Sequence, residues 1–269
     1  MPPSDLQPDP EGAAVLGAQA GSEGRAGLAF EAGAKAIDES RAASSGDARV
    51  ELGSEPRVHP GAFVLGPLRA GDRFSVFPTA VVGGPAQHRS AHPGALHIGH
   101  DVVVREGATV HRGSSAGAGI TSLGDRVLVM AYAHIGHDCQ IEHDVVLSNG
   151  TQLGGHVQVG AWTVFGARCA VHQHVRVGVG AMVVAGALVT GDVPPFTMVS
   201  GDRARVVGVN SAGLRAFGLS SSVDALRRGL RQHYAGVGID GGEDDPAVRA
   251  LVAFVRSVER RPLCSRGRG

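Results

Sequence analysis

The chain has 269 residues, with 25 basic and 25 acidic side chains and a formal net charge of zero at pH 7. This neutrality argues against a nucleic-acid-binding protein that depends on bulk electrostatics, so we expect no nucleic-acid partner. Glycine is abundant at 41 residues and aromatic residues make up only 4%, which is typical of tight turns around a narrow aliphatic interior.

The chain shows no leader of the secretory type and no apolar run long enough to cross a bilayer. We therefore expect a cytoplasmic protein without stable membrane insertion. The three cysteines, Cys139, Cys169 and Cys264, are odd in number and far apart. A disulfide framework is not expected, and Cys139 and Cys169 occupy positions predicted to pack in the core.

Residues 1–56 are rich in Ala, Gly, Ser, Pro, Asp and Glu and lack a sustained periodicity, so we expect a low-complexity, disordered segment. A six-residue register then begins. Its first small or aliphatic members are Val58, Val64, Ala70, Val76 and Val82.

Two insertions interrupt this register. Val82 and Ile98 are 16 residues apart, and Val110 and Leu123 are 13 apart, so neither interval is a multiple of six. Each excess must leave the stack as a loop, one near residues 85–94 and one at the Gly/Ser/Ala-rich segment 113–119. Loops that leave a regular solenoid commonly line a binding face.

An unbroken series follows, in which an aliphatic or aromatic residue returns every six positions. Its members are Leu123, Val129, Ile135, Ile141, Leu147, Leu153, Val159, Phe165, Val171, Val177, Val183 and Val189. Neither a helix nor a simple strand has this period. It is the hexapeptide repeat of a parallel β-helix, in which residues 18 apart stack roughly 4.8 Å from one another.

The repeat ends near the consecutive prolines Pro194 and Pro195, because two prolines in series stop strand pairing. We expect the β-helix to cover residues 57–196 and a helical domain to cover 197–269. Two helical stripes support that domain, one formed by Val223, Leu226, Leu230 and Tyr234, the other by Val248, Leu251, Val252 and Val255.

Eleven of the 13 histidines fall between His88 and His174. The register places His137, His156 and His172 at matching corners of successive coils, which predicts a ladder of imidazoles on one edge. Such a ladder could hold zinc, as in a hexapeptide carbonic anhydrase, but the histidine spacing does not match and we expect no metal. It could also supply a general base oriented by Asp138. On the residues alone, the chain is an acyl- or acetyltransferase candidate.

Six further motifs follow one another along the chain: His111-Arg112-Gly113, Ala133-His134-Ile135-Gly136-His137-Asp138-Cys139, Leu153-Gly154-Gly155-His156-Val157, Ala170-Val171-His172-Gln173, Asp192-Val193-Pro194-Pro195-Phe196, and Gly208-Val209-Asn210 with Gly213-Leu214. In their order and spacing they resemble one family, the acyl-carrier-protein-dependent UDP-N-acetylglucosamine O-acyltransferases of lipid A synthesis. The resemblance extends from about Val58 to the C-terminal helices.

The resemblance implies a homotrimer of left-handed parallel β-helices, each with a C-terminal α-helical domain, and active sites between subunits. This handedness is an exception to the usual crossover rule, and it comes from the resemblance alone. The implied reaction transfers an R-3-hydroxyacyl group from acyl carrier protein to the 3-hydroxyl of UDP-N-acetylglucosamine, the first step of lipid A biosynthesis. No cofactor is implied.

By motif match, His137 is the general base, Asp138 orients or polarises it, and the backbone N–H of Gly155 stabilises the oxyanion. His134, His156, His172 and Gln173 match residues that contact the sugar, the phosphates or the acyl-pantetheine arm. Asn210 matches a nucleotide contact. Ala185 matches a small residue, commonly glycine, on the wall of the acyl groove, so we expect a donor chain shorter than the family's longest.

The chain departs from the family's pattern at several acceptor contacts. In the first loop, His88 and Ser90 replace an aspartate and a lysine, and near Asn210 the residues Ala212 and Ala216 replace an acidic residue and an arginine. Two alternatives therefore stay open: an acyltransferase with another UDP-sugar acceptor, and a non-catalytic trimeric paralogue that binds acyl carrier protein.

Overall fold

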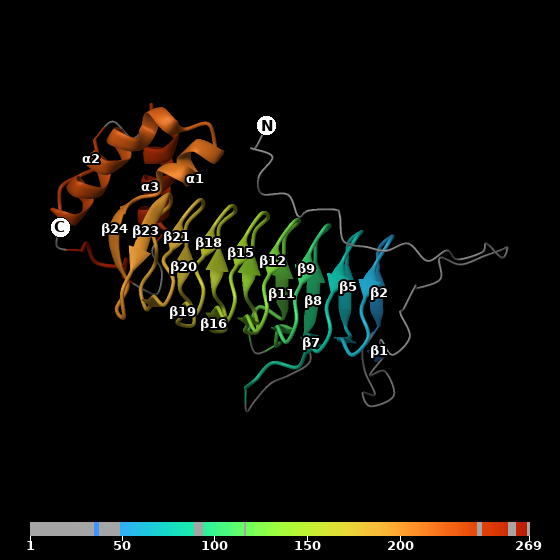
Figure 1. Ribbon diagram of the computed structural model, residues 1–269. Helices are drawn as coiled ribbons and strands as arrows, with labels where there is room; N and C mark the ends of the chain where they lie inside the picture. Colours follow the sequence, from blue (N-terminus) through green and yellow to red (C-terminus); the bar gives the residue numbers. More distant parts are fainter. Residues whose placement is uncertain are drawn as a thin grey trace.

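The computed structural model describes residues 49–88, 94–115, 117–240, 244–257 and 262–267, together with the backbone of a short strand at 35–37. In these residues the chain forms a stack of parallel coils followed by a small helical domain at the C-terminal end of the stack (Figure 1). Each coil contributes one short strand to each of three sheets, as the six-residue repeat predicts.

The three sheets are named sheet 1, sheet 2 and sheet 3. Sheet 1 contains β1 (Lys35–Ile37), β4 (Phe63–Leu65), β7 (Val81–Gly84), β10 (Thr109–His111), β13 (His134–Ile135), β16 (Gln152–Leu153), β19 (Ala170–Val171) and β22 (Leu188–Val189). Sheet 2 contains β2 (Val50–Leu52), β5 (Leu68–Ala70), β8 (Ala95–Ile98), β11 (Ile120–Leu123), β14 (Gln140–Ile141), β17 (Gln158–Val159) and β20 (Arg176–Val177). Sheet 3 contains β3 (Arg57–Val58), β6 (Ser75–Val76), β9 (Val103–Val104), β12 (Leu128–Val129), β15 (Val146–Leu147), β18 (Val164–Phe165), β21 (Met182–Val183), β23 (Thr197–Ser200) and the antiparallel β24 (Arg205–Val209).

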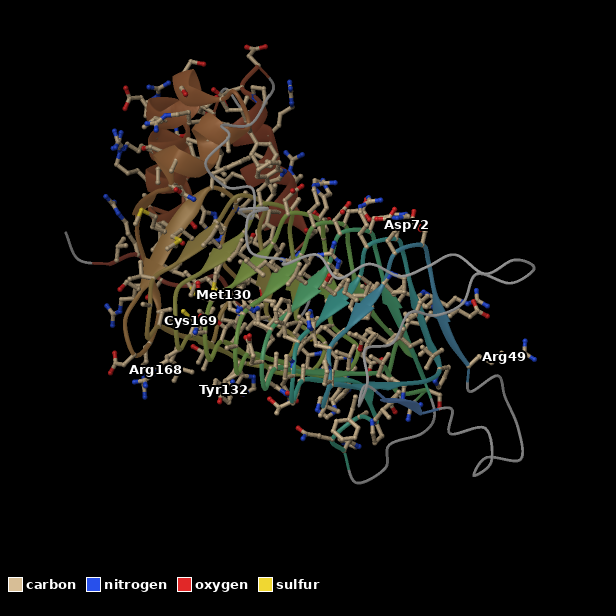
Figure 2. The ribbon with its side chains drawn as sticks, turned by 45° about the vertical axis from the view of Figure 1, so that its right-hand side comes forward. Arg49, Asp72, Met130, Tyr132, Arg168 and Cys169 are labelled. Carbon is tan, nitrogen blue, oxygen red and sulfur yellow. The ribbon has the colours of Figure 1, made fainter. Side chains whose placement is uncertain are left out.

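The residues of the repeat fill the interior of the coil. Leu153 pairs in register with Ile135 on one side and Val171 on the other, and all three side chains are at most 4% exposed. Cys139 and Cys169 are buried in the same core, as expected, and Cys169 is labelled in Figure 2. Stacked aliphatic side chains in a dry interior supply the main stabilisation of such a solenoid.

Both predicted loops leave the stack where the sequence places them. Val82 pairs with Val110, 28 residues later, and Val110 pairs with Ile135, 25 residues later, instead of the regular 18. The strands on either side of each loop therefore keep their inward residues in register, so the extra residues are accommodated outside the coil.

The β-helix begins before residue 57, the N-terminal boundary that the sequence predicts. Strand β2 pairs with β5, with Leu52 opposite Ala70, so Leu52 is one six-residue step before Val58. The rest of residues 1–56 lies almost wholly outside the described residues, and its predicted disorder stays a prediction. At the other boundary, β23 and β24 continue sheet 3 beyond residue 196.

The helical domain comprises α1 (Ser211–Ala216), a 3-10 turn (Ser220–Ser222), α2 (Val223–Tyr234) and α3 (Pro246–Arg256). Leu226 and Leu230 of the predicted α2 stripe pack with Leu251 of α3 and with Leu214. The segment 262–267 returns to the β-helix, where Tyr234 donates a hydrogen bond to the carbonyl oxygen of Cys264. In the described part of the chain, no helix has the length and apolarity needed to cross a bilayer.

Candidate active site

The candidate site lies on the edge where each coil turns from sheet 1 to sheet 2. Asp138, His156 and His174 occupy the same corner position in three successive coils and have φ values of 60°, 61° and 63°. Asp and His tolerate this left-handed conformation better than most side chains do. The 18-residue register thus turns three separate motifs into one column.

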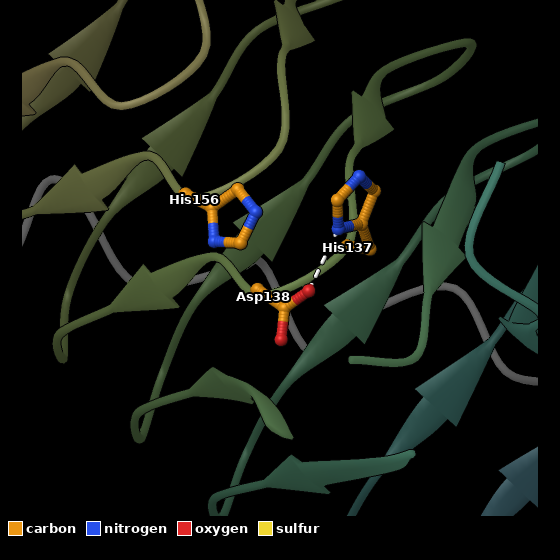
Figure 3. Close-up of side chains that lie close together, drawn as sticks. All are labelled: His137, Asp138 and His156. Carbon is orange, nitrogen blue, oxygen red and sulfur yellow. Dashed lines mark hydrogen bonds and ion pairs between the residues drawn. The ribbon is translucent and has the colours of Figure 1, made fainter. Parts of the chain in front are cut away.

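His137 and Asp138 form a hydrogen-bonded pair. The Nδ1 atom of His137 lies 2.7 Å from Oδ2 of Asp138, and their side chains are 17% and 0% exposed (Figure 3). A carboxylate in this position accepts the hydrogen bond, so it holds the proton on Nδ1 and leaves the lone pair of Nε2 available. This is the arrangement of a general base with an orienting carboxylate.

The backbone at Gly155 lies directly beside this base. A Cβ atom added to Gly155 would lie 2.8 Å from Nε2 of His137, closer than real Cβ atoms approach their neighbours. In the described part of the chain, the N–H of Gly155 donates to no backbone carbonyl. The structure therefore brings the predicted base and the predicted oxyanion donor together.

The imidazole ladder exists, but its third member differs from the prediction. The ring of His156 lies 5.0 Å from that of His137, and the ring of His174 stacks on His156 at 4.4 Å. His172 was expected in this column, and that expectation is wrong. His172 lies two positions earlier in its coil, and its exposed ring contacts the carbonyl oxygen of Gln173 at 3.2 Å.

A second histidine pair lies beside the site on sheet 1. His134 is hydrogen-bonded through Nδ1 to the Thr109 hydroxyl at 2.8 Å, and its ring lies 5.1 Å from that of His111. Burial, and then repulsion from the His111 and His137 rings, lowers the pKa of His134 to about 4. Burial likewise lowers the pKa of His111, whose Nδ1 contacts the carbonyl oxygen of Pro85 at 2.6 Å. His134 is therefore a neutral imidazole at pH 7.

His137, Asp138 and His156 offer ligand atoms within 4.8 Å of one another, the spacing of a potential metal site. However, Asp138 already accepts hydrogen bonds from His137 and from the backbone N–H groups of Ser114 and Gly119. A contact of 2.7 Å between Nδ1 and Oδ2 is a hydrogen-bond distance. The carboxylate is therefore already engaged by hydrogen bonds, and we propose no metal ligation here.

The remaining predicted contacts lie in different places. Gln173 is exposed on the same edge as His137, one coil beyond Gly155. Ala185 is exposed on another edge, between sheet 3 and sheet 1. Asn210 caps α1: its Oδ1 accepts from the N–H of Gly213, and its Nδ2 donates to the carbonyl oxygen of Gly180 at 2.9 Å. The Oδ1 atom thus caps the helix and the Nδ2 group joins it to the β-helix, and the nucleotide contact of Asn210 stays a prediction.

The departures from the family's pattern are also located. His88 is exposed, and its ring lies 6.1 Å from the ring of His137. Ala212 and Ala216 are exposed on α1, and Ser90 lies outside the described residues. His88 is therefore the one of these positions that the structure places against the base.

Several residues near the pair were not anticipated from the sequence. Ser114, Gly117, Gly119 and Thr121 contact Asp138 or lie against it, and Thr109 contacts His134. The only available signal was the glycine-rich composition of the second loop, which indicated a loop but not its target.

The comparisons with known proteins agree with this geometry. A family model described as UDP N-acetylglucosamine O-acyltransferase, domain 2, matches residues 192–264. A second model, described as bacterial transferase hexapeptide (six repeats), matches residues 120–155. The second match includes His137, Asp138 and Gly155, and the first begins where the β-helix ends.

Relatives are found among acyl-(acyl-carrier-protein)–UDP-N-acetylglucosamine O-acyltransferases. The enzyme of Burkholderia thailandensis is 40% identical over 197 residues, which cover 67% of this chain and 75% of that protein. The enzyme of Burkholderia lata is 38% identical over 197 residues, with the same coverage of each chain.

Solved structures show the same fold. The UDP-N-acetylglucosamine O-acyltransferase of Moraxella catarrhalis superposes with a TM-score of 0.75 at 27% identity, covering 80% of this chain and 88% of that chain. The corresponding acyltransferase of Campylobacter jejuni gives 0.74 at 29% identity, covering 81% and 88%. The expected fold, a left-handed parallel β-helix with a C-terminal helical domain, is confirmed. With this fold, this site and relatives at 40% identity, the chain belongs to the UDP-N-acetylglucosamine O-acyltransferase family.

Proposed function

We propose that the protein transfers an R-3-hydroxyacyl group from acyl carrier protein to the 3-hydroxyl of UDP-N-acetylglucosamine, the first step of lipid A biosynthesis. The observation that carries this proposal is the His137–Asp138 pair beside the backbone of Gly155. Together these residues supply a base for a hydroxyl group and a donor for an oxyanion, which is what acyl transfer from a thioester requires.

In the proposed mechanism, Nε2 of His137 removes the proton of the sugar hydroxyl as its oxygen attacks the thioester carbonyl. The Asp138 carboxylate stabilises the imidazolium that forms, and the Gly155 N–H donates to the oxyanion of the tetrahedral intermediate. The intermediate then collapses: the C–S bond breaks, the new ester remains on the sugar, and the imidazolium gives its proton to the departing thiolate, which leaves as the free thiol of acyl carrier protein.

The polar residues around the pair fit the two substrates. The neutral ring of His134 presents one N–H donor when Nδ1 accepts from Thr109. We propose that His134 and His156 contact the sugar or the phosphates, and that His172 and Gln173 contact the acyl-pantetheine arm further along the edge. Asn210 is proposed as a nucleotide contact that contributes less to binding, because its side-chain oxygen already caps α1.

An apolar ladder on sheet 3 supports a trimer. The outward, half-buried residues of successive strands in this sheet are Val103, Leu128, Val146, Val164, Met182 and Met198. The corresponding outward residues of sheet 2 are polar, namely Ser122, Gln140, Gln158 and Arg176. A continuous apolar face on a solenoid indicates a surface that is covered in the functional protein. We propose a homotrimer, acting in the cytoplasm, in which neighbouring subunits and the acyl chain share this face.

A second candidate function is acyl transfer to a different UDP-amino sugar. The observation that favours it is His88, whose ring faces His137 at 6.1 Å, where relatives are expected to carry a carboxylate. Ala212 and Ala216 also lack the side-chain charges expected near the nucleotide. The non-catalytic alternative is less well supported, because such a protein would have no chemical need for the His137–Asp138 pair.

A transfer assay that pairs a panel of UDP-sugars with hydroxyacyl carrier proteins tests these proposals. We expect ester formation on UDP-N-acetylglucosamine that depends on an acyl carrier protein donor. Transfer to another UDP-amino sugar with a higher kcat/KM would support the second candidate. If wild-type protein transfers to no acceptor in the panel but binds acyl carrier protein, the non-catalytic alternative replaces both.

A further inference from the structure

The second loop of the β-helix contacts the carboxylate of Asp138. The backbone N–H of Ser114 lies 3.2 Å from each carboxylate oxygen, and the N–H of Gly119 lies 2.9 Å from Oδ1. Oδ2 is also the partner of His137. The Ser114 N–H thus contacts both oxygens, the Gly119 N–H contacts Oδ1 alone, and Oδ2 is the oxygen that bonds His137.

The strand that follows the loop fixes the backbone of the same residue. Thr121 is fully buried, and its hydroxyl oxygen accepts a hydrogen bond from the N–H of Asp138 at 2.8 Å. This contact holds Asp138 in its left-handed backbone conformation, with φ of 60°. We name Ser114, Gly119 and Thr121 the carboxylate clamp.

Gly117 allows the loop to pack against the pair. A Cβ atom at this position would lie 2.8 Å from Cγ and Oδ2 of Asp138 and 2.6 Å from Cε1 of His156. Within the loop, the N–H groups of Gly117 and Gly119 both donate to the carbonyl oxygen of Ser114. The turn is thus internally bonded, and its close approach to both functional side chains requires a residue without a side chain.

We propose that the carboxylate clamp and Gly117 are positioning elements for the reaction, a role that rests on the proposed function and deepens it. The N–H of Gly119, which donates to Oδ1, leaves Oδ2 as the oxygen that faces His137. That oxygen keeps the His137 proton on Nδ1, so Nε2 can act as the base. A displaced carboxylate would release the ring to the other tautomer, which cannot accept the hydroxyl proton from the same position.

The first test replaces Gly117 with alanine and uses Ala118→Gly, an exposed neighbour in the same loop, as the matched control. Gly117→Ala should lower kcat by roughly 10- to 100-fold, with KM within about threefold of wild type, because the base is misoriented while substrate contacts remain. Ala118→Gly should retain wild-type kcat. If Gly117→Ala also retains it, the proposed role of the loop is overturned.

The second test uses Thr121, because Gly117→Ala could also disturb folding. Thr121→Val keeps the shape but removes the acceptor of the Asp138 N–H, whereas Thr121→Ser keeps the acceptor. We expect kcat to fall in the valine variant and to return towards wild type in the serine variant. Equal losses in both variants, at unchanged melting temperature, would show that Thr121 acts through packing and would remove it from the clamp.

A readout that is independent of turnover separates this inference from the proposed function. Nitrogen-15 NMR of labelled histidine distinguishes a ring protonated at Nδ1 from one protonated at Nε2. Wild type and Ala118→Gly should show His137 with the proton on Nδ1, and Gly117→Ala should show a mixture or the other tautomer. The same tautomer in all three proteins would overturn the clamp even if the enzyme proves active. A tautomer change in a protein that transfers no acyl group would uphold the clamp while the proposed function fails.

Discussion

The imidazole of His137 lies against the backbone of Gly155, so close that a Cβ atom on Gly155 would be 2.8 Å from Nε2 and 2.9 Å from Cε1. The two residues come from adjacent coils, 18 positions apart in the sequence. Stacking of the coils therefore places the proposed base and the proposed backbone donor side by side without any long-range loop. This proximity makes the site sensitive to the smallest possible side-chain addition.

Gly155→Ala should reduce kcat by about 10²-fold, because the added methyl group must displace the imidazole from the reacting hydroxyl. Gly208→Ala is the matched control, since a Cβ there meets nothing within 4 Å and the backbone φ is not positive. Steady-state kinetics and thermal unfolding of both variants check the prediction. A Gly155→Ala enzyme with wild-type kcat would show that the ring has room to move and that the geometry is not critical.

His137→Ala should nearly abolish transfer while leaving assembly and melting temperature little changed. Loss of a general base typically costs 10²–10⁴-fold in rate, and the 17% exposed His137 side chain lies at a corner, outside the aliphatic core. Kinetics with chemistry as the slow step, together with light scattering, provide the measurement. More than about a tenth of wild-type turnover would contradict the assignment of the base.

The apolar ladder on sheet 3 leads to a prediction about assembly. Light scattering at micromolar concentration should give the mass of three chains of 27.4 kDa. Met182→Lys, on this ladder, should weaken assembly, because it places a charge in a surface that is expected to be covered. Gln158→Lys, an outward residue of sheet 2, is the control and should leave the mass unchanged. A wild-type monomer would contradict the trimer.

His134 gives the stability of the protein a specific pH dependence. Its pKa in the folded protein, about 4, is below the ordinary histidine value of 6.5, so the unfolded chain binds this proton first as pH falls. The stabilisation is complete above about pH 6.5 and decreases as pH falls towards 4. The melting temperature of the wild type should therefore fall further between pH 7 and pH 5 than that of His134→Gln. Parallel losses in the two proteins would show that His134 is not the titrating group.

The sequence predicts those parts of the fold that the six-residue repeat determines. The inward residues from Val58 to Val189 were predicted correctly, because burial imposes a fixed six-residue spacing on them. Leu52 was missed because its coil begins in a segment whose composition suggested disorder. The 18-residue spacing between coils leads from position 156 to position 174. Applied from His156, it places His174, and not His172, in the imidazole column.

The carboxylate clamp could not be predicted in the same way. Ser114 and Gly119 act through backbone N–H groups. Every residue except proline has such a group, so the residue type does not reveal this contact. The direction taken by a loop outside the stack is set by local turns and by the surface that it meets, and neither has a period. The motif match identified His137 and Asp138, whereas only the structure shows what holds them in place.

The final prediction concerns the length of the donor acyl chain and rests on Ala185. Its exposed side chain lies on the edge between sheet 3 and sheet 1, near Met182 of the apolar ladder. The Cβ of Ala185 is 3.1 Å from the position that a Cβ would occupy on Gly166, one coil below. Because the Ala185 side chain is exposed, it does not fill the interior of the coil.

Where relatives are expected to carry glycine, the extra methyl group should stop the acyl chain early. Overpacking in a tight groove costs about 1–3 kcal/mol, and each CH₂ kept out of the groove forfeits about 0.8 kcal/mol of burial. Wild type should therefore prefer a donor two to four carbons shorter than Ala185→Gly does, by roughly one to two orders of magnitude in kcat/KM.

Competition among 10-, 12- and 14-carbon hydroxyacyl carrier proteins measures this preference. Ala167→Gly, an exposed substitution on the same edge one coil earlier, is the control and should keep the wild-type preference. A wild-type preference for 14 carbons that Ala185→Gly leaves unchanged would show that chain length is set elsewhere.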